Sequence, residues 1–322
     1  MSGEDESSGW QLTESDPGVF SELLKTLGVP LIVDDLYALD AASLAQFQPI
    51  SAFIFLFKWV QSPTSPMAGN FDSSFPGFFA HQVVNNACAT LAVMNAIGNI
   101  SGLPMGSQLA DLIAFTTGMD PQMRGMAITS SDWLREAHNA LSPPSAISLD
   151  GLGLPKTTED AYHFIVYMPY LGSVYEFDGL KSNPISHGTY EESGEGWIAK
   201  ARDVIEARIA TYPPGALDFS LLALHEDPLP SLTKQLDEAQ KSNNGFIAEQ
   251  LMVRITNENA KREQWAFENS LRRHNYVGFV HALLSAMAKS GTLDKAKEDA
   301  RKVMKERIAK QKEKGGAAMD ED

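Results

Sequence analysis

The chain has 322 residues, 43% of them hydrophobic, and a formal net charge of −15. That length and apolar content can bury a sizeable core with a smaller unit beside it. No uncharged apolar run reaches the roughly 18 residues of a membrane span, and the acidic opening lacks a signal-peptide pattern, so we expect an intracellular protein without a membrane partner. The acidic balance disfavours nucleic acid as a partner and favours basic ligands, although solubility alone also explains it.

The N-terminal part of the chain mixes helix and strand signals. Residues 1–7 are polar and acidic, and we expect them to be disordered. Residues 15–28 are typical of a helix, with Asp16 or Ser15 as its cap and Pro17 in its first turn. The apolar run "SAFIFLFKWV", residues 51–60, predicts a buried central strand.

The middle of the chain continues this mixture. Residues 87–97, "ACATLAVMNAI", predict a buried helix, because small or apolar residues occupy almost every side. Residues 142–160 contain three prolines and predict a long loop of the kind that is often functional. A β-hairpin is predicted for residues 162–180, and a last strand for residues 218–227.

Strand signals stop near residue 230. We therefore predict an α/β (α+β) domain over residues 8–230 and an all-α extension over residues 231–314. The end of the extension, residues 295–314, is rich in Lys and Arg. Residues 315–322 form an acidic end that we expect to be disordered.

Cys88 is the only cysteine of the chain, so it cannot form an internal disulfide. It lies in the first turn of the predicted helix at 87–97, which Asn85 and Asn86 can cap. The unpaired backbone N–H groups and the dipole at a helix start stabilise a thiolate, which is the nucleophilic form of cysteine. A buried cysteine acting as a small hydrophobe is the alternative, and position alone does not separate the two.

A nucleophilic cysteine needs a base, a group that orients the base, and an oxyanion donor. If Tyr170 and Leu171 form the turn of the predicted hairpin, His163 and Asp178 face one another with Cβ atoms about 5 Å apart. The carboxylate can then hold one ring nitrogen while the other faces the thiolate; a cross-strand polar pair without a catalytic role is the alternative. Gln82, in the loop before the helix, can donate to an oxyanion or be an ordinary loop residue.

The other histidines are weaker candidates for the base. His138 is expected on a charged helix face, His187 after a turn, and His225 in solvent at a strand end. His81 has no carboxylate near it in the sequence that could orient its ring. The chain contains no two-histidine zinc helix, no cysteine cluster and no phosphate-binding loop, so we expect neither a metal nor a cofactor.

The order Gln, Cys, His, Asp is papain-like, and five segments around it resemble the signature segments of the ubiquitin C-terminal hydrolases, a family of thiol proteases. These segments are "ESDPGVFSELL", "FIFLFKW", "NNACAT", "AYHFIVY" and "YEFDGL", in the family's order. The resemblance implies roles for four residues: Cys88 as nucleophile, His163 as general base and proton donor, Asp178 as the residue that orients it, and Gln82 as oxyanion stabiliser.

The same resemblance implies a fold and a substrate. The fold is a papain-like α-β-α sandwich with a knotted backbone, which is rare among proteins. The substrate is ubiquitin joined through its C-terminus to another group. The loop at 142–160 resembles the crossover loop that arches over the active site of this family and limits the size of the leaving group.

Residues 268–290 of the extension, with "RRHNY" before an apolar helix, resemble the C-terminal domain of the long, proteasome-associated branch of the family. This implies a ubiquitin-receptor subunit of the proteasome as a partner, in some lineages a chromatin-remodelling complex, and a location in cytoplasm and nucleus. The expected partner-binding residues are Arg272, Arg273, Tyr276, Phe279 and Leu283. A helix that only packs on the catalytic domain is the alternative.

Two functions of different classes follow from the sequence. The first is a cysteine protease that hydrolyses the bond at the C-terminal glycine of ubiquitin through an acyl-enzyme. The second is a regulatory scaffold of a proteasome or chromatin complex with restrained or weak hydrolase activity; the complete set of four site residues argues against an inactive core. Nucleic-acid binding by the basic tail ranks below both, because acidic residues interrupt its charge and it has no aromatic residues.

Overall fold

The computed structural model describes residues 9–58, 68–142, 162–212 and 219–317, with side chains to residue 306. The expectations for residues 1–7, for the loop at 143–160 and for residues 318–322 lie outside the described residues.

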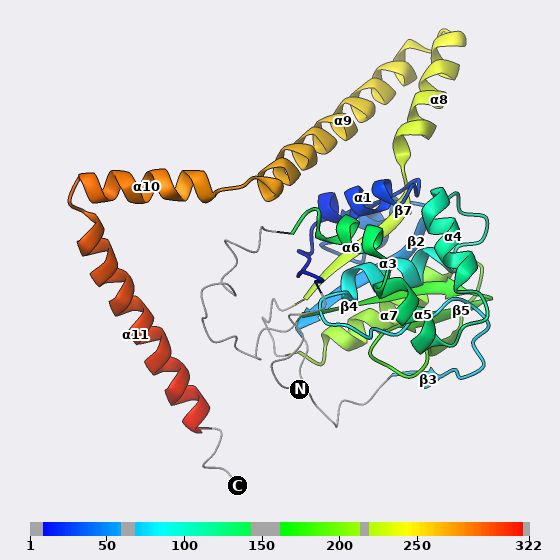
Figure 1. The fold of residues 1–322 in the computed structure, drawn as a ribbon. Coiled ribbons are helices and arrows are strands. Elements are labelled where there is room, and N and C mark those ends of the chain that lie inside the picture. The colour runs from blue at the N-terminus through cyan, green and yellow to red at the C-terminus, as the bar shows by residue number, and fades with distance from the viewer. Residues whose placement is uncertain (1–8, 59–67, 143–161, 213–218, 318–322) are drawn as a thin grey trace. The chain divides into compact units, whose positions relative to one another are not determined.

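Within these described residues, seven strands form one antiparallel sheet (Figure 1), in the order β1-β7-β2-β4-β5-β6-β3. Their bounds are β1 Leu31–Asp35, β2 Ile50–Lys58, β3 Asn70–Phe71, β4 Tyr162–Tyr170, β5 Ser173–Phe177, β6 Ile185–Thr189 and β7 Phe219–Glu226. The predicted last strand is β7, which pairs with both β1 and β2 and so brings the two ends of the predicted α/β domain together.

Helices cover both faces of this sheet. The bounds of the helices are α1 Pro17–Thr26, α2 Ala41–Ala45, α3 Cys88–Ile97, α4 Ser107–Phe115, α5 Pro121–Thr129, α6 Asp132–Asn139, α7 Trp197–Ile209, α8 Pro228–Lys241, α9 Gly245–Arg273, α10 Val277–Lys289 and α11 Leu293–Ala317. Side chains of α1, α3, α4, α5 and α6 share one buried cluster with the sheet, and side chains of α2 and α7 share a second cluster on its other face. The predicted α-β-α sandwich is therefore confirmed.

The apolar run at 51–60 corresponds to β2, a central strand between β7 and β4. Its side chains point alternately to the two faces of the sheet. Ala52 and Ile54 lie in the buried cluster that includes α3, whereas Phe53 and Phe55 lie in the cluster that includes α7. A strand buried on both faces needs apolar residues at nearly every position, which is why its sequence shows a continuous run instead of an alternation.

The hairpin of β4 and β5 forms where the sequence predicts it, but with a different turn. Tyr170 pairs with Ser173, so the turn residues are Leu171 and Gly172, not Tyr170 and Leu171. Both have positive φ, 45° and 78°, as a type I′ hairpin turn requires. The register is thus shifted by two residues, and a shift by an even number leaves every side chain on its predicted face.

The long helix α9 belongs to the same compact unit as the sheet, together with α8; this unit ends at Arg273. The predicted boundary near residue 230 therefore does not coincide with its end. Trp265 of α9 lies against Gly18 of α1 so closely that a Cβ on that glycine would lie 2.8 Å from the indole ring. Asn269 donates a hydrogen bond to the Gly18 carbonyl at 3.0 Å.

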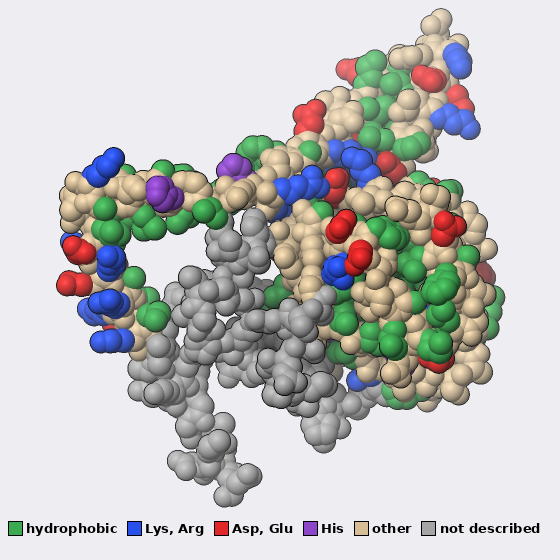
Figure 2. All heavy atoms as spheres, in the orientation of Figure 1, with side chains coloured by type: hydrophobic (Ala, Val, Ile, Leu, Met, Phe, Trp, Pro, Cys, Tyr) green, Lys and Arg blue, Asp and Glu red, His purple; other side chains and the backbone are tan. Residues whose placement is uncertain are grey.

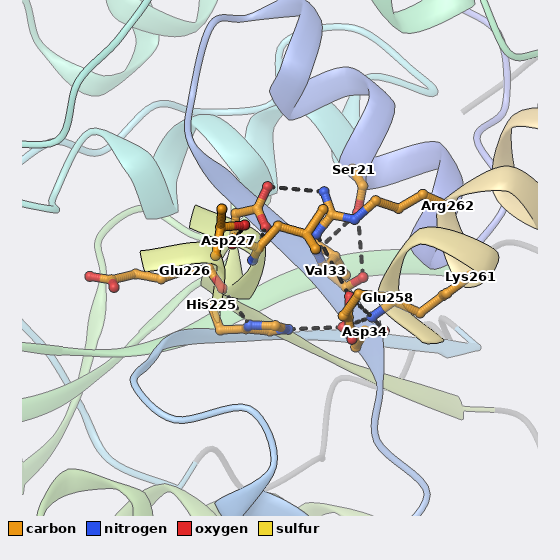
Figure 3. Close-up of polar contacts among 11 residues, drawn as sticks. Ser21, Val33, Asp34, His225, Glu226, Asp227, Glu258, Lys261 and Arg262 are labelled. Atoms are coloured by element: carbon orange, nitrogen blue, oxygen red, sulfur yellow. Dashed lines mark hydrogen bonds and ion pairs between the residues drawn. The ribbon is translucent and has the colours of Figure 1, made fainter. Parts of the chain in front are cut away.

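Ionic contacts also hold α9 against the core (Figure 3). Asp34, in β1, accepts hydrogen bonds from Lys261 Nζ at 2.9 and 3.0 Å and from His225 Nε2 at 3.0 Å. Burial raises the pKa of Asp34, but the bonds from His225 and Lys261 outweigh it, so the pKa is lowered. Arg262 binds both oxygens of Asp227, at 2.7 and 2.9 Å. His225, expected in solvent, is instead a buried partner of this network.

The remaining helices, α10 and α11, belong to a second unit that begins after Arg273. No residue of α10 is buried. Residues 315–317, which we expected to be disordered, are part of α11. Among the helices that the structure describes, none combines the length and apolarity needed to cross a bilayer.

His138 of α6 is 4% exposed, although the sequence places it on a charged face. Its Nδ1 lies 2.7 Å from Thr90 Oγ1 in α3, and its Nε2 lies 2.7 Å from the Gln11 carbonyl. The ring also meets Trp10 edge-on at 4.8 Å. Burial lowers the pKa of His138 to about 4. An uncharged histidine therefore joins the N-terminal segment to α6 and α3.

We predict that acid destabilises the protein through His138. The unfolded chain takes up this proton near pH 6.5 and the folded protein only near pH 4, so stability is lost as the pH falls through that window. The loss attributable to this ring is ~3 kcal/mol. Urea unfolding at several pH values measures it. His138→Gln should show a shallower decline, and an unchanged decline would assign the acid sensitivity to other groups.

Candidate active site

Cys88 is the first residue of α3, a helix in which every residue is buried. The N-cap position is held by Ala87, whose side chain makes no cap hydrogen bond. Neither of the predicted asparagines is the N-cap residue, and Asn86 has a φ of 66° and donates to the Trp10 carbonyl at 3.1 Å. Because Cys88 begins the helix, backbone N–H groups of the first turn of α3 can act on the sulfur or on a ligand beside it.

His163 in β4 and Asp178, just after β5, are joined by a hydrogen bond of 2.6 Å from Nε2 to Oδ1. Both residues are 4% exposed. In the observed register they are diagonal neighbours on one face instead of directly opposed. Asp178 also accepts from the Leu180 N–H at 2.9 Å. Burial raises the pKa of Asp178, but the bond from His163 and the charge on its ring outweigh burial and lower it.

Cys88 also acts on the imidazole of His163, and its influence is seen in the pKa of the ring. Burial lowers the pKa of His163, but the hydrogen bonds to Asp178 and Cys88, with the negative charges of both, raise it to about 9. The ring is therefore protonated at neutral pH. An imidazolium beside the sulfur stabilises the thiolate that a cysteine nucleophile requires.

Phe57 of β2 packs its ring edge-on against His163, with centroids 5.8 Å apart at 83°. The two residues are partners across β2 and β4. The guanidinium of Arg208 lies over Phe57 at 4.4 Å, and Nη1 donates to Glu176 at 2.8 Å and to Tyr167 at 3.0 Å. The sequence gives no indication that these residues belong to the site, apart from the aromatic "FLF" of β2.

Gln82 lies in the segment between the sheet and α3. Its backbone N–H donates to the Gly179 carbonyl at 2.8 Å, one residue beyond Asp178. The side-chain Oε1 is enclosed and has no hydrogen-bond partner within the described residues. The amide of Gln82 is thus not committed to the fold, and its NH₂ group can donate to a ligand.

A model of "Ubiquitin carboxyl-terminal hydrolase, family 1" matches residues 10–210, and a second model, of "Ubiquitin carboxyl-terminal hydrolases", matches residues 248–293. The chain belongs to the ubiquitin carboxyl-terminal hydrolase family. As a member of that family it is a cysteine peptidase, and the expected enzyme class is confirmed. Within the described residues, no three His, Cys, Asp or Glu side chains gather in a way that could hold a metal ion.

Relatives of the hydrolase cover nearly its whole length. It is 37% identical to "Ubiquitin carboxyl-terminal hydrolase 2" of Schizosaccharomyces pombe, over 87% of this chain and 91% of that one. It is 35% identical to "Ubiquitin carboxyl-terminal hydrolase ubh-4" of Caenorhabditis elegans, over 94% of each. The crystal structure of Trichinella spiralis UCH37 bound to ubiquitin vinyl methyl ester superposes with a TM-score of 0.66 at 30% identity, covering 80% of this chain and 99% of that chain.

Two of the predicted partner-binding residues of the hydrolase have partners inside the compact unit. Arg272 donates to Glu14 at 3.1 Å and to Asp16 at 2.8 Å, and Arg273 donates to Glu22 at 3.0 Å. These bonds fix the end of α9 to α1 and the segment before it. The other three differ: Tyr276 is half-buried, and Phe279 and Leu283 on α10 are 64% and 48% exposed.

Proposed function

We propose that Cys88, His163 and Asp178 are the catalytic triad with which this hydrolase cleaves the bond at the C-terminal glycine of ubiquitin. The buried hydrogen bond of 2.6 Å between His163 and Asp178 supports this assignment most directly, together with the effect of Cys88 on the pKa of that imidazole. The crystal structure of the Trichinella relative, which holds a ubiquitin derivative, supports ubiquitin as the substrate. The net charge of −15 suits the basic tail of ubiquitin.

In the proposed mechanism the Cys88 thiolate attacks the terminal glycine carbonyl. The side-chain amide of Gln82 and the backbone N–H of Cys88 donate to the oxyanion that forms. His163 then protonates the leaving amine and, as the neutral base, activates the water that releases ubiquitin from the acyl-enzyme. Asp178 holds the ring in position and stabilises its charged form, without itself taking the proton.

Replacing Cys88 by Ala should abolish hydrolysis of a small C-terminal ubiquitin amide while ubiquitin still binds. Loss of a covalent nucleophile costs about 10⁶-fold in kcat in a comparable protease. Turnover and calorimetric binding of ubiquitin measure the two effects. Near-normal turnover by Cys88→Ala would refute the proposed nucleophile.

Turnover should fall above about pH 9, because His163 then loses the proton that the leaving amine needs. Asp178→Asn removes a charge and a hydrogen-bond acceptor that raise the pKa of His163, so this falling limb should move to lower pH. The rate should lie between those of the parent and of His163→Ala. Profiles of kcat/KM against pH, with urea unfolding as the folding control, test this. A parental profile for Asp178→Asn would contradict its orienting role.

We further propose that α10 binds a helical partner and that this partner is a ubiquitin-receptor subunit of the proteasome. Figure 2 shows hydrophobic side chains along α10 and charged ones along the described part of α11. The exposed residues of α10 include Val277, Phe279, Val280, Leu283 and Leu284. Exposed apolar residues of this kind mark partner sites on soluble proteins. The match of the second family model to residues 248–293 supports an extension shared within the family. A chromatin-remodelling complex is the second candidate.

Deletion of residues 274–322 should leave the triad reactive and abolish co-sedimentation with purified proteasomes. The compact unit ends at Arg273, so the cut spares the contacts of α9 with α1 and β1. Labelling by ubiquitin vinyl methyl ester reports the first effect.

A paired substitution localises the second effect. Phe279→Ser with Leu283→Ser should reproduce the loss of co-sedimentation. Val303→Ser with Met304→Ser, a pair on α11 that is 48% exposed at both positions, should not. Retained co-sedimentation of the truncated protein would place docking elsewhere.

A further inference from the structure

Residues 78–82, the segment that ends at Gln82, belong to no helix or strand, and side chains make several of their hydrogen bonds. Phe78 donates its N–H to Asn99 Oδ1 at 2.8 Å and accepts from Asn99 Nδ2 at 2.7 Å. Ala80 makes the same pair of bonds with Asn95, at 2.8 and 3.2 Å. The two asparagines, four residues apart in α3 and just beyond its end, thus bind alternate residues as a neighbouring strand would.

The opposite edge of this segment is bonded to α5. Arg124 Nη1 donates to the Phe79 carbonyl at 2.8 Å, and the His81 N–H donates to the Pro121 carbonyl at 2.9 Å. Gly125 comes so close that a Cβ there would lie 2.1 Å from the His81 carbonyl oxygen. The segment therefore has little freedom to shift, and its position depends on the elements on either side.

Asn95 joins this segment to α3, the helix that carries Cys88, through its two hydrogen bonds with Ala80. It is 1% exposed, so no solvent replaces its hydrogen bonds. It lies seven residues, or about two turns, after the cysteine in one rigid helix, while Ala80 lies two residues before Gln82. A side-chain amide is the group that both donates and accepts at this position; a carboxylate only accepts, and an alkyl group does neither.

We propose that Asn95 is a positioning residue for oxyanion stabilisation: it fixes the distance between Gln82 and Cys88 by clamping Ala80 to α3. This inference rests on the proposed role of Gln82 as oxyanion donor. On its other side, Gln82 is held by the hydrogen bond from its N–H to the Gly179 carbonyl. The two residues are packed so closely that a Cβ on Gly179 would lie 3.1 Å from the Gln82 nitrogen. Loss of the Asn95 clamp removes the direct side-chain bonds between this segment and α3, the helix that carries Cys88.

The test compares Asn95→Leu with Asn139→Leu in the full chain. Asn139 of α6 is half-buried and also makes two bonds to another segment, accepting from the Gln11 N–H at 3.0 Å and donating to the Gly9 carbonyl at 2.7 Å. Both substitutions break two bonds between a helix and an extended segment, but only one segment carries Gln82. Asn99→Leu, at a less buried position further from Gln82, serves if Asn95→Leu does not fold, and its effect should be smaller in size.

Three readouts separate oxyanion stabilisation from general damage. For Asn95→Leu, kcat on a small ubiquitin amide should fall about 10- to 100-fold with KM unchanged, as expected for a displacement of an ångström or less in a donor. Affinity for ubiquitin aldehyde, which forms a hemithioacetal with the cysteine, should fall by the same factor. The rate of alkylation by ubiquitin vinyl methyl ester should stay unchanged, because the thiolate attacks an alkene carbon instead of the carbonyl.

Control variants distinguish a failure of the proposed role of Gln82 from a failure of the proposed role of Asn95. Gln82→Ala should lower kcat and aldehyde affinity, and the double variant with Asn95→Leu should fall no further than Gln82→Ala alone. If Gln82→Ala has no effect, the proposed role of Gln82 fails and this inference fails with it. If Gln82→Ala acts but Asn95→Leu behaves like Asn139→Leu, or slows alkylation as much as turnover, the inference alone is overturned.

Discussion

The hydrogen bond between His163 and Asp178 is the constraint on which the site depends. Both groups are buried, and a buried carboxylate that loses its partner costs several kcal/mol, so the hairpin that carries them has one acceptable register. That register requires positive φ at Leu171 and Gly172. The pairing of β4 with β2 then sets Phe57 against the ring. One register of the β4–β5 hairpin therefore determines the turn, the place of Phe57 and the hydrogen bond between His163 and Asp178.

The sheet contains two more buried histidine–carboxylate pairs, which shows that such a pair is not itself an active site. His187 lies 3.1 Å from Glu176, and His225 lies 3.0 Å from Asp34. The first is joined to Arg208 and the second to Lys261, so each carboxylate has a permanent cation. Asp178 has His163 as its partner instead, and that ring also reaches Cys88. Contact with a thiol at a helix start therefore distinguishes the proposed catalytic pair.

Periodicity predicted the elements that carry the site, because α3, β2 and the β4–β5 hairpin bury faces that local sequence displays. It placed the turn one residue too early, since nothing in "PYLGS" signals a leucine at positive φ. It also placed His138 and His225 at the surface, because their partners at Gln11 and Asp34 are far away in the chain. Local patterns report which face is apolar but not which distant polar group lies opposite.

Ion pairs help to explain why the compact unit extends to Arg273, at the end of α9. Lys261, Arg262, Arg272 and Arg273 of α9 each meet a carboxylate contributed by the sheet, the start of α8 or the region of α1. Exposed ion pairs contribute little singly, but these accompany Trp265 packed on Gly18 and the buried bond from Asn269. These four basic residues of α9 are therefore occupied within the unit, whereas α10, in which no residue is buried, presents exposed apolar side chains that a partner can cover.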